Sequence, residues 1–533
     1  MCVRVIKTIV VIAGLLAGLL IGGCEGGAGT RELAVLEGLG TPIGSLVEVM
    51  TPGQVAVEGY GIVGGLRGTG SGDCPVRIRK YLEQYILKQS PGQRIDVNKF
   101  IGSSETAVVR VYGVMSTSVS EGRHFDVTIR TLPGSQTTSL EGGWLYRTEL
   151  KQLGSFGLTT RILGMAEGPV FIDTLETNGT DKRSGYGLAG GTVLGEYPID
   201  LLLRRPDFRI ANEIRNRLNS RFGPETAKAD TSRRIVLRVP AQYGKQQERF
   251  ISIVRTMYLT ESPEITRKRI TTFIGRLAGS DDKEISEIAL EAIGKESLKK
   301  LPALLNSGYE EVRFRAARCM LNLGSDVGLE TLLAIAKDKG SAKRFEALEA
   351  IAAGASRNDA AAILRQMLGD ENFEIRLAAY EQLRDLEDVS IIRRPIARSF
   401  YLDQISRTEH KAVYVSRSGE PRIVLFGAPI FCRDNLFVQS ANGDITIDSR
   451  AGQHYVSLIR KHPSRPTVIG PLRSSLELSD IIQTLCAEPV QRSETGRIGL
   501  GVSYADMIAF LKLMSEKKAI EVPFLAGALP EIE

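Results

Sequence analysis

The decisive stretch of the sequence, residues 59–70, reads GYGIVGGLRGTG. Half of it is glycine, and its first six residues match the GxGxxG pattern of dinucleotide-binding loops. That pattern binds a nucleotide only between a strand and a helix. Here the glycines continue to Gly72 and Pro75 follows, which excludes a helix at this point. We therefore expect a glycine-rich turn that needs positive φ angles or close packing against another segment.

The composition is that of an ordinary globular protein, with 43% hydrophobic and 24% charged residues in 533. This length predicts about three or four domains. The net charge of +6 falls to +4 if Arg4 and Lys7 are removed with a leader. Such a small and scattered positive charge argues against a nucleic-acid partner.

The N-terminus carries a targeting signal. Arg4 and Lys7 precede an apolar run at residues 9–20, and small residues stand directly before Cys24. This arrangement predicts a lipoprotein signal peptide over residues 1–23, with Cys24 as an acylated N-terminus that anchors the protein to a membrane. Glu25 in place of aspartate favours the outer membrane. The alternative is a secretory signal that is cleaved without acylation.

Four further cysteines would lie in an oxidising compartment, where they allow three pairings. Cys319 has the position of a buried thiol on an apolar helix face, and Cys432 with Cys486 is the most plausible disulfide. The sequence has no CxxC, and its four histidines form no ligand cluster. We therefore expect no metal, no cofactor and no catalytic residues.

Further stretches follow the glycine run in a fixed order. They read SEGRHFDVTI at 120–129, SLEGGWL at 139–145, RPDF at 205–208 and GVSYADMI at 501–508. With the glycine run, they resemble motifs of the bacterial flagellar P-ring proteins, over most of residues 46–260 and 412–522. The signature residues that the resemblance marks for assembly are Gly59, Tyr60, Gly61, Gly64, Gly65, Gly68, Thr69, Gly70, Asp126, Gly142, Gly143, Pro206, Asp207 and Phe208.

The resemblance implies an α+β subunit of a closed homo-oligomeric ring in the periplasm. Such a ring surrounds the flagellar rod beside the outer-membrane L ring and acts as a bushing in the basal body, with no chemical step. It would contact other copies of itself and the rod and L-ring proteins. The lipobox and a repeat segment are additions to the family pattern.

The repeat segment lies where the ring motifs are interrupted. Residues 311–317 (EVRFRAA) match residues 374–380 (EIRLAAY), and RFEA at 344–347 stands halfway between them. A period near 31 residues with alanines on one helix face resembles short HEAT repeats. Their arginines would be solvent-exposed or capping residues, or a surface for an acidic partner. We expect the repeats to project as a separate module with little effect on the rest of the core.

The expected architecture is α+β, with mixed α/β ring domains interrupted by an all-α repeat module. The alternative function is an outer-membrane lipoprotein scaffold whose repeats bind an unknown protein. An enzyme is disfavoured, because the sequence shows no paired carboxylates and no Ser/His/Asp set. The expected segments are a signal peptide at 1–23, ring-like domains at 24–150 and 151–262, repeats at 263–395 and a C-terminal ring-like domain at 396–533.

Overall fold

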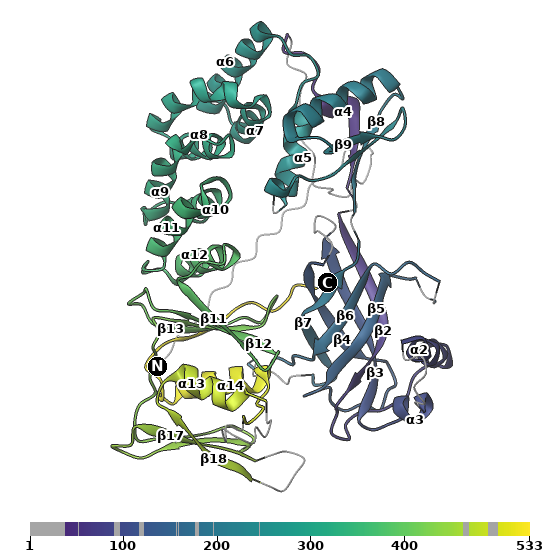
Figure 1. Ribbon diagram of the computed structural model, residues 1–533, viewed down its shortest axis with the longest axis vertical. Coiled ribbons are helices and arrows are strands. Elements are labelled where there is room, and N and C mark those ends of the chain that lie inside the picture. Colours follow the sequence, from purple (N-terminus) through teal and green to yellow (C-terminus); the bar gives the residue numbers. More distant parts are fainter. Residues whose placement is uncertain are drawn as a thin grey trace, which may run out of the picture.

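The fold is described from a computed structural model. It covers residues 38–532 apart from 52, 90–95, 117–121, 156, 158, 176–180, 196, 245, 462–467 and 489–498. The expected signal peptide and Cys24 lie outside the described residues. Figure 1 shows a barrel, a small α/β domain, an arc of helices and a layered C-terminal domain. The predicted α+β class is confirmed.

Six antiparallel strands form a closed barrel in the order β2-β3-β4-β7-β6-β5. Its interior is filled by aliphatic side chains such as Val57, Val111 and Ile129. Two helices, α2 (Val76–Gln89) and α3 (Val97–Ile101), pack on the outside of the barrel. The strands are β2 (Gln54–Gly64), β3 (Thr106–Ser116), β4 (His124–Thr131), β5 (Trp144–Gln152), β6 (Gly164–Pro169) and β7 (Ser184–Val193).

The barrel extends past the domain boundary expected from the sequence. That boundary, between residues 150 and 151, falls inside β5, and β6 and β7 complete the barrel as far as residue 193. The expected boundary is wrong because the barrel closes by pairing β5 with β2, two segments far apart in the sequence. Hydrophobic alternation within one segment carries no information about such a partner.

A small α/β domain follows the barrel. Its antiparallel sheet has the order β1-β8-β10-β9, so the earliest strand forms one edge and pairs with a strand from much later in the chain. Helices α4 and α5 pack against this sheet through a common apolar core. The elements are helix α1 (Ile43–Leu46), β1 (Val47–Met50), β8 (Ile199–Leu203), α4 (Phe208–Phe222), β9 (Ala227–Ala229), β10 (Arg234–Leu237) and α5 (Gln247–Thr256).

The repeat segment is an arc of helices, as its 31-residue period predicts. Arginines at equivalent repeat positions are Arg313, Arg344 and Arg376, and each donates to a backbone carbonyl of the segment before its helix. Arg344 therefore caps the end of the preceding helix, one of the roles expected, whereas Arg313 and Arg376 bind carbonyls of the loop before their helices. The helices are α6 (Pro263–Gly279), α7 (Lys283–Ile293), α8 (Glu310–Asn322), α9 (Leu329–Lys337), α10 (Arg344–Gly354), α11 (Arg357–Met367) and α12 (Phe373–Asp385).

The C-terminal domain has two sheets with two helices between them (Figure 1). Met507, Leu511 and Met514 lie at helical spacing and are fully buried there, so this side of the helix belongs to the core. The first sheet contains β11 (Ile391–Ile396), β12 (Phe400–Ile405), β14 (Arg422–Phe426), β13 (Ala412–Val415) and β19 (Phe524–Ala526). The helices are α13 (Leu478–Cys486) and α14 (Tyr504–Glu516), and the second sheet contains β15 (Leu436–Gln439), β16 (Ile445–Ser449), β17 (Tyr455–Lys461) and β18 (Val468–Ser475).

The expected disulfide is absent. Cys432 and Cys486 are free thiols buried in the core of the C-terminal domain, and Cys74 and Cys319 are also free. Burial raises the pKa of the Cys432 thiol to about 12 and also raises that of Cys486. Both side chains belong to the same apolar core, where they pack as small hydrophobic groups and are not bonded to each other. Cys319 is fully buried, as predicted.

The first end of the arc packs against the α/β domain. Ile288 and Ala292 of α7 belong to the same core as Ile253 of α5. Beside them, the fully buried carboxylate of Glu287 is 2.7 Å from Arg249 of α5. It also pairs with two arginines of α8, Arg315 at 3.0 Å and Arg318 at 2.6 Å. An apolar core and a buried ionic network thus join α5, α7 and α8.

The second end of the arc packs on the C-terminal domain. Tyr414 and Phe426 of the first sheet share a core with the last helices of the arc. The hydroxyl of Tyr380 in α12 donates to the buried carboxylate of Asp403 at 2.6 Å. The expectation of a projecting module is therefore wrong. Removal of residues 264–394 would uncover apolar faces on two other domains instead of leaving a folded remainder.

We predict that Glu287 makes stability acid-sensitive. Burial would raise the pKa of Glu287, but Arg249 and Arg318 outweigh it and lower the pKa to about 2. The stabilisation is thus complete above the unfolded pKa of about 4.3 and is lost as pH falls toward 2. Glu287→Gln should lower stability at pH 7 by about 3–5 kcal/mol, because it breaks a buried pair.

Thermal melting from pH 7 to pH 2 measures this effect. The wild-type melting temperature should fall steeply below about pH 4.3, and that of Glu287→Gln should fall less. Glu284→Gln is the matched control, because Glu284 is exposed and its nearest guanidinium nitrogen is 3.9 Å away. Equal melting curves for wild type and Glu287→Gln would show that the network contributes no stability.

Candidate assembly site

The first half of the glycine run is a strand, and the expected turn is wrong there. Residues 59–64 belong to β2, which closes the barrel against β5. A Cβ at Gly59 would lie 2.2 Å from the Glu149 carbonyl oxygen, and one at Gly61 would lie 2.1 Å from Oγ1 of Thr148. The β2–β5 register is irregular between Glu58 and Val63, around these glycines. The missing side chains therefore let β5 cross β2 at close range.

The second half of the run is the turn that the sequence predicts. Gly65 and Gly68 have φ angles of 77° and 78°, which favour glycine. The Thr69 hydroxyl donates to the Ser139 carbonyl at 2.8 Å, and the Gly70 N–H donates to Ser104 at 2.8 Å. The turn thus fastens two other loops at one end of the barrel.

The second predicted motif lies against the first. A Cβ at Gly143 would lie 2.4 Å from Cγ1 of Val63 in β2, and Gly142 has a φ angle of 72°. The Tyr60 side chain points to the outside, where it packs against the core under α2 and α3. The structure therefore brings together all signature residues from Gly59 to Gly70 with Gly142 and Gly143.

Asp126 joins the barrel to the C-terminal domain. Its carboxylate accepts hydrogen bonds from the Ala189 N–H in β7 at 2.6 Å and from the Gly419 N–H at 2.8 Å. Burial raises the pKa of this carboxyl group, and the two backbone donors partly offset that effect. His124, on the same strand, is exposed, and its Nδ1 lies 3.2 Å from the Thr192 hydroxyl.

Three more contacts strengthen this joint. Arg417 forms an ion pair with Asp173 at 2.9 Å, and both side chains are largely buried. The Lys512 ammonium of α14 donates to the Leu175 carbonyl at 3.1 Å. Phe171 of the barrel belongs to the core of the C-terminal domain. None of these pairs is visible as a motif, because their members are more than 200 residues apart.

Tyr504 is the centre of the joint on the C-terminal side. It directly follows Ser503, whose side chain caps α14 by accepting a hydrogen bond from the Asp506 N–H. Its hydroxyl lies 2.7 Å and 2.8 Å from the carbonyl oxygens of Ser416 and Arg422, and its ring is 6.0 Å from Phe171. Burial raises the pKa of the Tyr504 hydroxyl above its ordinary value.

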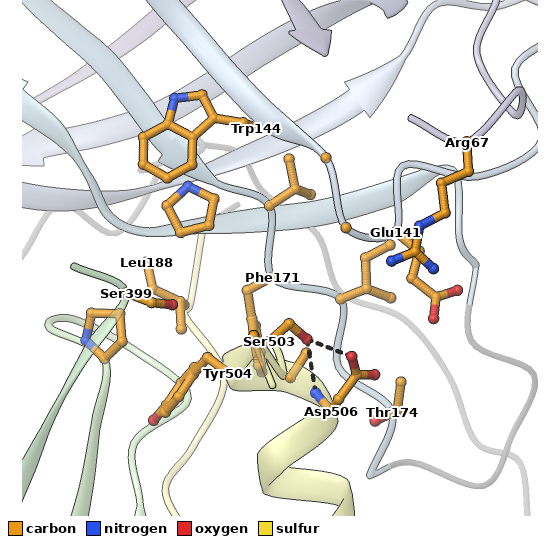
Figure 2. A pocket seen from close by; sticks show the side chains of 18 of the residues that line it. Arg67, Glu141, Trp144, Phe171, Thr174, Leu188, Ser399, Ser503, Tyr504 and Asp506 are labelled. Atoms are coloured by element: carbon orange, nitrogen blue, oxygen red, sulfur yellow. Dashed lines mark hydrogen bonds between the residues drawn. The ribbon is translucent and has the colours of Figure 1, made fainter. Parts of the chain in front are cut away.

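A cavity of about 240 Å³ lies beside this joint. Figure 2 shows Arg67 and Trp144 on its barrel side, with Tyr504 and Asp506 at the start of α14 on the other side. Gly142 and Gly143 also line it, so the glycine end of the barrel meets the C-terminal domain here. Sequence reasoning missed Arg67, Trp144 and Tyr504 as a group, because each belongs to a different segment.

The remaining signature residues lie elsewhere. Pro206 and Asp207 form the turn before α4, in the α/β domain, and the Asp207 carboxylate caps that helix through the Arg209 N–H at 2.7 Å. Phe208 is 68% exposed. The signature residues therefore form a barrel seam, a domain joint and a separate surface turn. Among the described residues, no group of His, Cys, Asp and Glu is arranged to hold a metal ion.

We predict that Gly61→Val prevents correct closure of the barrel. The new side chain would meet the buried Thr148 at the seam, and overpacking of this kind costs about 1–3 kcal/mol or more. Gly275→Ala in α6 is the control, because a Cβ there meets nothing and removes flexibility from a helix. Thermal melting should show a loss for the first variant and none for the second.

A double variant makes the test specific. Thr148→Gly removes the atoms nearest to the added Cβ, so Gly61→Ala with Thr148→Gly should be less destabilised than the two single effects summed. If Gly61→Val melts like the wild type, the close approach of β5 to β2 does not constrain the barrel.

Comparison with known proteins finds a family that part of this chain resembles. Residues 43–271 match the family model described as flagellar P-ring protein. The flagellar P-ring protein of Campylobacter lari is 31% identical over 222 residues, which cover 39% of this chain and 59% of the relative. Those of Hydrogenovibrio crunogenus and Desulfotalea psychrophila are 25% and 24% identical over 251 residues, or 44% of this chain and 64% and 62% of the relatives.

The chain thus spans about three fifths of the length of these curated relatives. The matched residues contain the glycine seam, Asp126 and the turn at Pro206, so they include every signature residue singled out by the motifs. The predicted resemblance is confirmed for residues 43–271, through which this chain is related to the flagellar P-ring proteins, and it stays a prediction for residues 412–522.

Proposed function

We propose that this chain is a structural subunit of a flagellar P ring. The observation that carries the proposal is the family match over residues 43–271, which spans the whole barrel and the α/β domain. In this role the chain forms a closed homo-oligomeric ring in the periplasm, around the flagellar rod and beside the L ring. A closed ring requires heterologous contacts, in which one face of a subunit binds a different face of the next.

The role is mechanical and has no chemical step. Shared cores join the barrel to the C-terminal domain, the C-terminal domain to the arc and the arc to the α/β domain. The chain itself joins the α/β domain to the barrel (Figure 1), and this closed arrangement supports the proposal because a bushing must resist deformation. The strongly buried polar groups, such as Glu287 and Asp403, are held in internal pairs. Within the described part of the chain, nothing favours the alternative scaffold that recruits a partner through its repeats.

The proposal includes a lipid anchor at Cys24, which would hold the ring subunit at the outer membrane. The basic and apolar leader and the small residues before Cys24 support it. None of the helices described is long and apolar enough to cross a membrane. An acyl anchor is a separate means of attachment, which needs no spanning helix.

The ring prediction is tested on the purified mature chain. Electron microscopy with mass measurement should show closed rings of one subunit type, alone or on isolated basal bodies. Gly275→Ala should form the same rings, and Gly61→Val should not, because its barrel is distorted. A wild-type chain that stays monomeric and is absent from basal bodies would refute the ring role and leave the scaffold as the better account.

We predict that the mature N-terminus is an acylated Cys24. Mass spectrometry of the N-terminal peptide should show cleavage after Gly23 and the mass of attached acyl chains, because the lipobox directs both steps. Cys24→Ser should abolish the lipid mass and release the protein from the membrane fraction. An unmodified cysteine, or a chain that still begins at Met1, would contradict the prediction.

A further inference from the structure

Two neighbouring turns of the α/β domain form a basic surface around one exposed aromatic ring, which we call the Phe208 apex. Phe208 is 68% exposed at the start of α4. Four arginines surround it in the sequence and in the adjacent β9–β10 turn, and all four are exposed. The apex consists of Phe208 with Arg204, Arg205, Arg209 and Arg233.

Backbone hydrogen bonds hold the two turns side by side. The Asp207 N–H donates to the Ser232 carbonyl at 2.9 Å, and the Leu203 N–H donates to the Arg233 carbonyl at 2.7 Å. The Asp207 carboxylate is engaged with the N-terminus of α4, where it accepts from the N–H groups of Arg209 and Ile210. These hydrogen bonds fix the backbone of both turns, and therefore the positions from which the four arginines extend.

The four guanidinium groups of the apex carry uncompensated charge. In the part of the chain that the structure describes, no carboxylate forms an ion pair with any of them. The same domain neutralises another arginine, Arg234, which pairs with Asp200 at 3.0 Å and with Asp230 at 3.6 Å. Four unpaired guanidinium groups lie next to an exposed phenyl ring. This surface is complementary to a partner that is negatively charged and partly apolar.

The chain that follows the predicted anchor packs first against α6 and then forms β1 of the same domain. The Leu46 carbonyl accepts a hydrogen bond from the Arg204 N–H at 2.9 Å, and β1 pairs directly with β8. Only thirteen residues, or fourteen Cα–Cα steps, separate Cys24 from Gly38, the first described residue. At about 3.3–3.6 Å per residue they span at most ~50 Å. In Figure 1 the elements β8, α4 and α6 lie together at one end of the molecule.

We propose that the Phe208 apex docks on the surface of an anionic phospholipid bilayer. Aromatic rings insert at the boundary of headgroups and acyl chains, and arginines bind anionic headgroups, so the two components match the two parts of that surface. The inference rests on the proposed function only for the anchor at Cys24. The anchor attaches the chain to the membrane, and the apex sets which end of the subunit faces it.

The test uses the mature chain from residue 24, made without acylation, so that binding reports the apex alone. Sedimentation with vesicles of phosphatidylglycerol and phosphatidylcholine should pellet the protein, and pure phosphatidylcholine vesicles should not. Each basic residue contributes about five-fold to such partitioning. Arg204→Glu with Arg205→Glu should therefore weaken binding by about 25-fold or more, and Phe208→Ser should weaken it at every salt concentration.

Matched controls separate the apex from overall charge and hydrophobicity. Lys80→Glu with Lys88→Glu makes the same charge change on exposed residues of α2, and Phe437→Ser removes another exposed phenyl ring, in β15. Both should bind anionic vesicles like the wild type. Equal losses in apex and control variants, or no binding by the wild type, would overturn the proposal. So would an apex pair that binds vesicles normally but no longer forms rings, since the apex would then contact a second copy.

Discussion

The carboxylate of Asp126 holds two parts of the molecule in one arrangement. One oxygen accepts the N–H of Ala189 inside the barrel, and the other accepts the N–H of Gly419 in the C-terminal domain. The group is buried, so the two donors replace the water that the charge has lost. Around it, the Arg417–Asp173 pair and the shared core at Phe171 fix the same joint. The orientation of the barrel relative to the C-terminal sheets depends on this set of contacts.

The arc of helices links the α/β domain to the C-terminal domain. Together with the joint at Asp126, it closes the four parts of the molecule into one frame. It begins on α5, through the core at Ile288 and the network around Glu287, and it ends on the first C-terminal sheet at Tyr380. The barrel connects to the α/β domain at one end and to the C-terminal domain at the other (Figure 1). Relative motion of any two parts must therefore break a buried contact elsewhere, which suits the proposed role under mechanical load.

Much of this fold could be predicted from local patterns. The strand at 199–203, the helix from residue 76 and the N-cap at Ser503 follow from alternation, periodicity and capping, which are properties of one segment. The family signature likewise contains residues of both the seam and the joint. Its glycines, however, favour a turn by intrinsic propensity, and only the approach of β5 explains why Gly59 and Gly61 lie in a strand.

The failed expectations all concerned contacts between distant segments. The independent repeat module and the domain boundary at residue 150 depended on which segments meet, and the disulfide depended on how two thiols of one core are placed. No periodic pattern in the sequence predicts that Tyr380 pairs with Asp403, or that Gly419 pairs with Asp126. Local sequence determines which faces are apolar, but it does not determine which other face covers them.

Hydrogen exchange of the Gly419 amide is the most direct test of the frame. In a closed frame this N–H should exchange as slowly as the barrel amides of Val111 and Ile129, because its donation to Asp126 is released only when the whole subunit opens. Asp126→Ala should accelerate it selectively while the barrel amides stay protected. Exchange of Gly419 in the wild type at the rate of an exposed loop amide would show that the domains separate freely, which contradicts the frame.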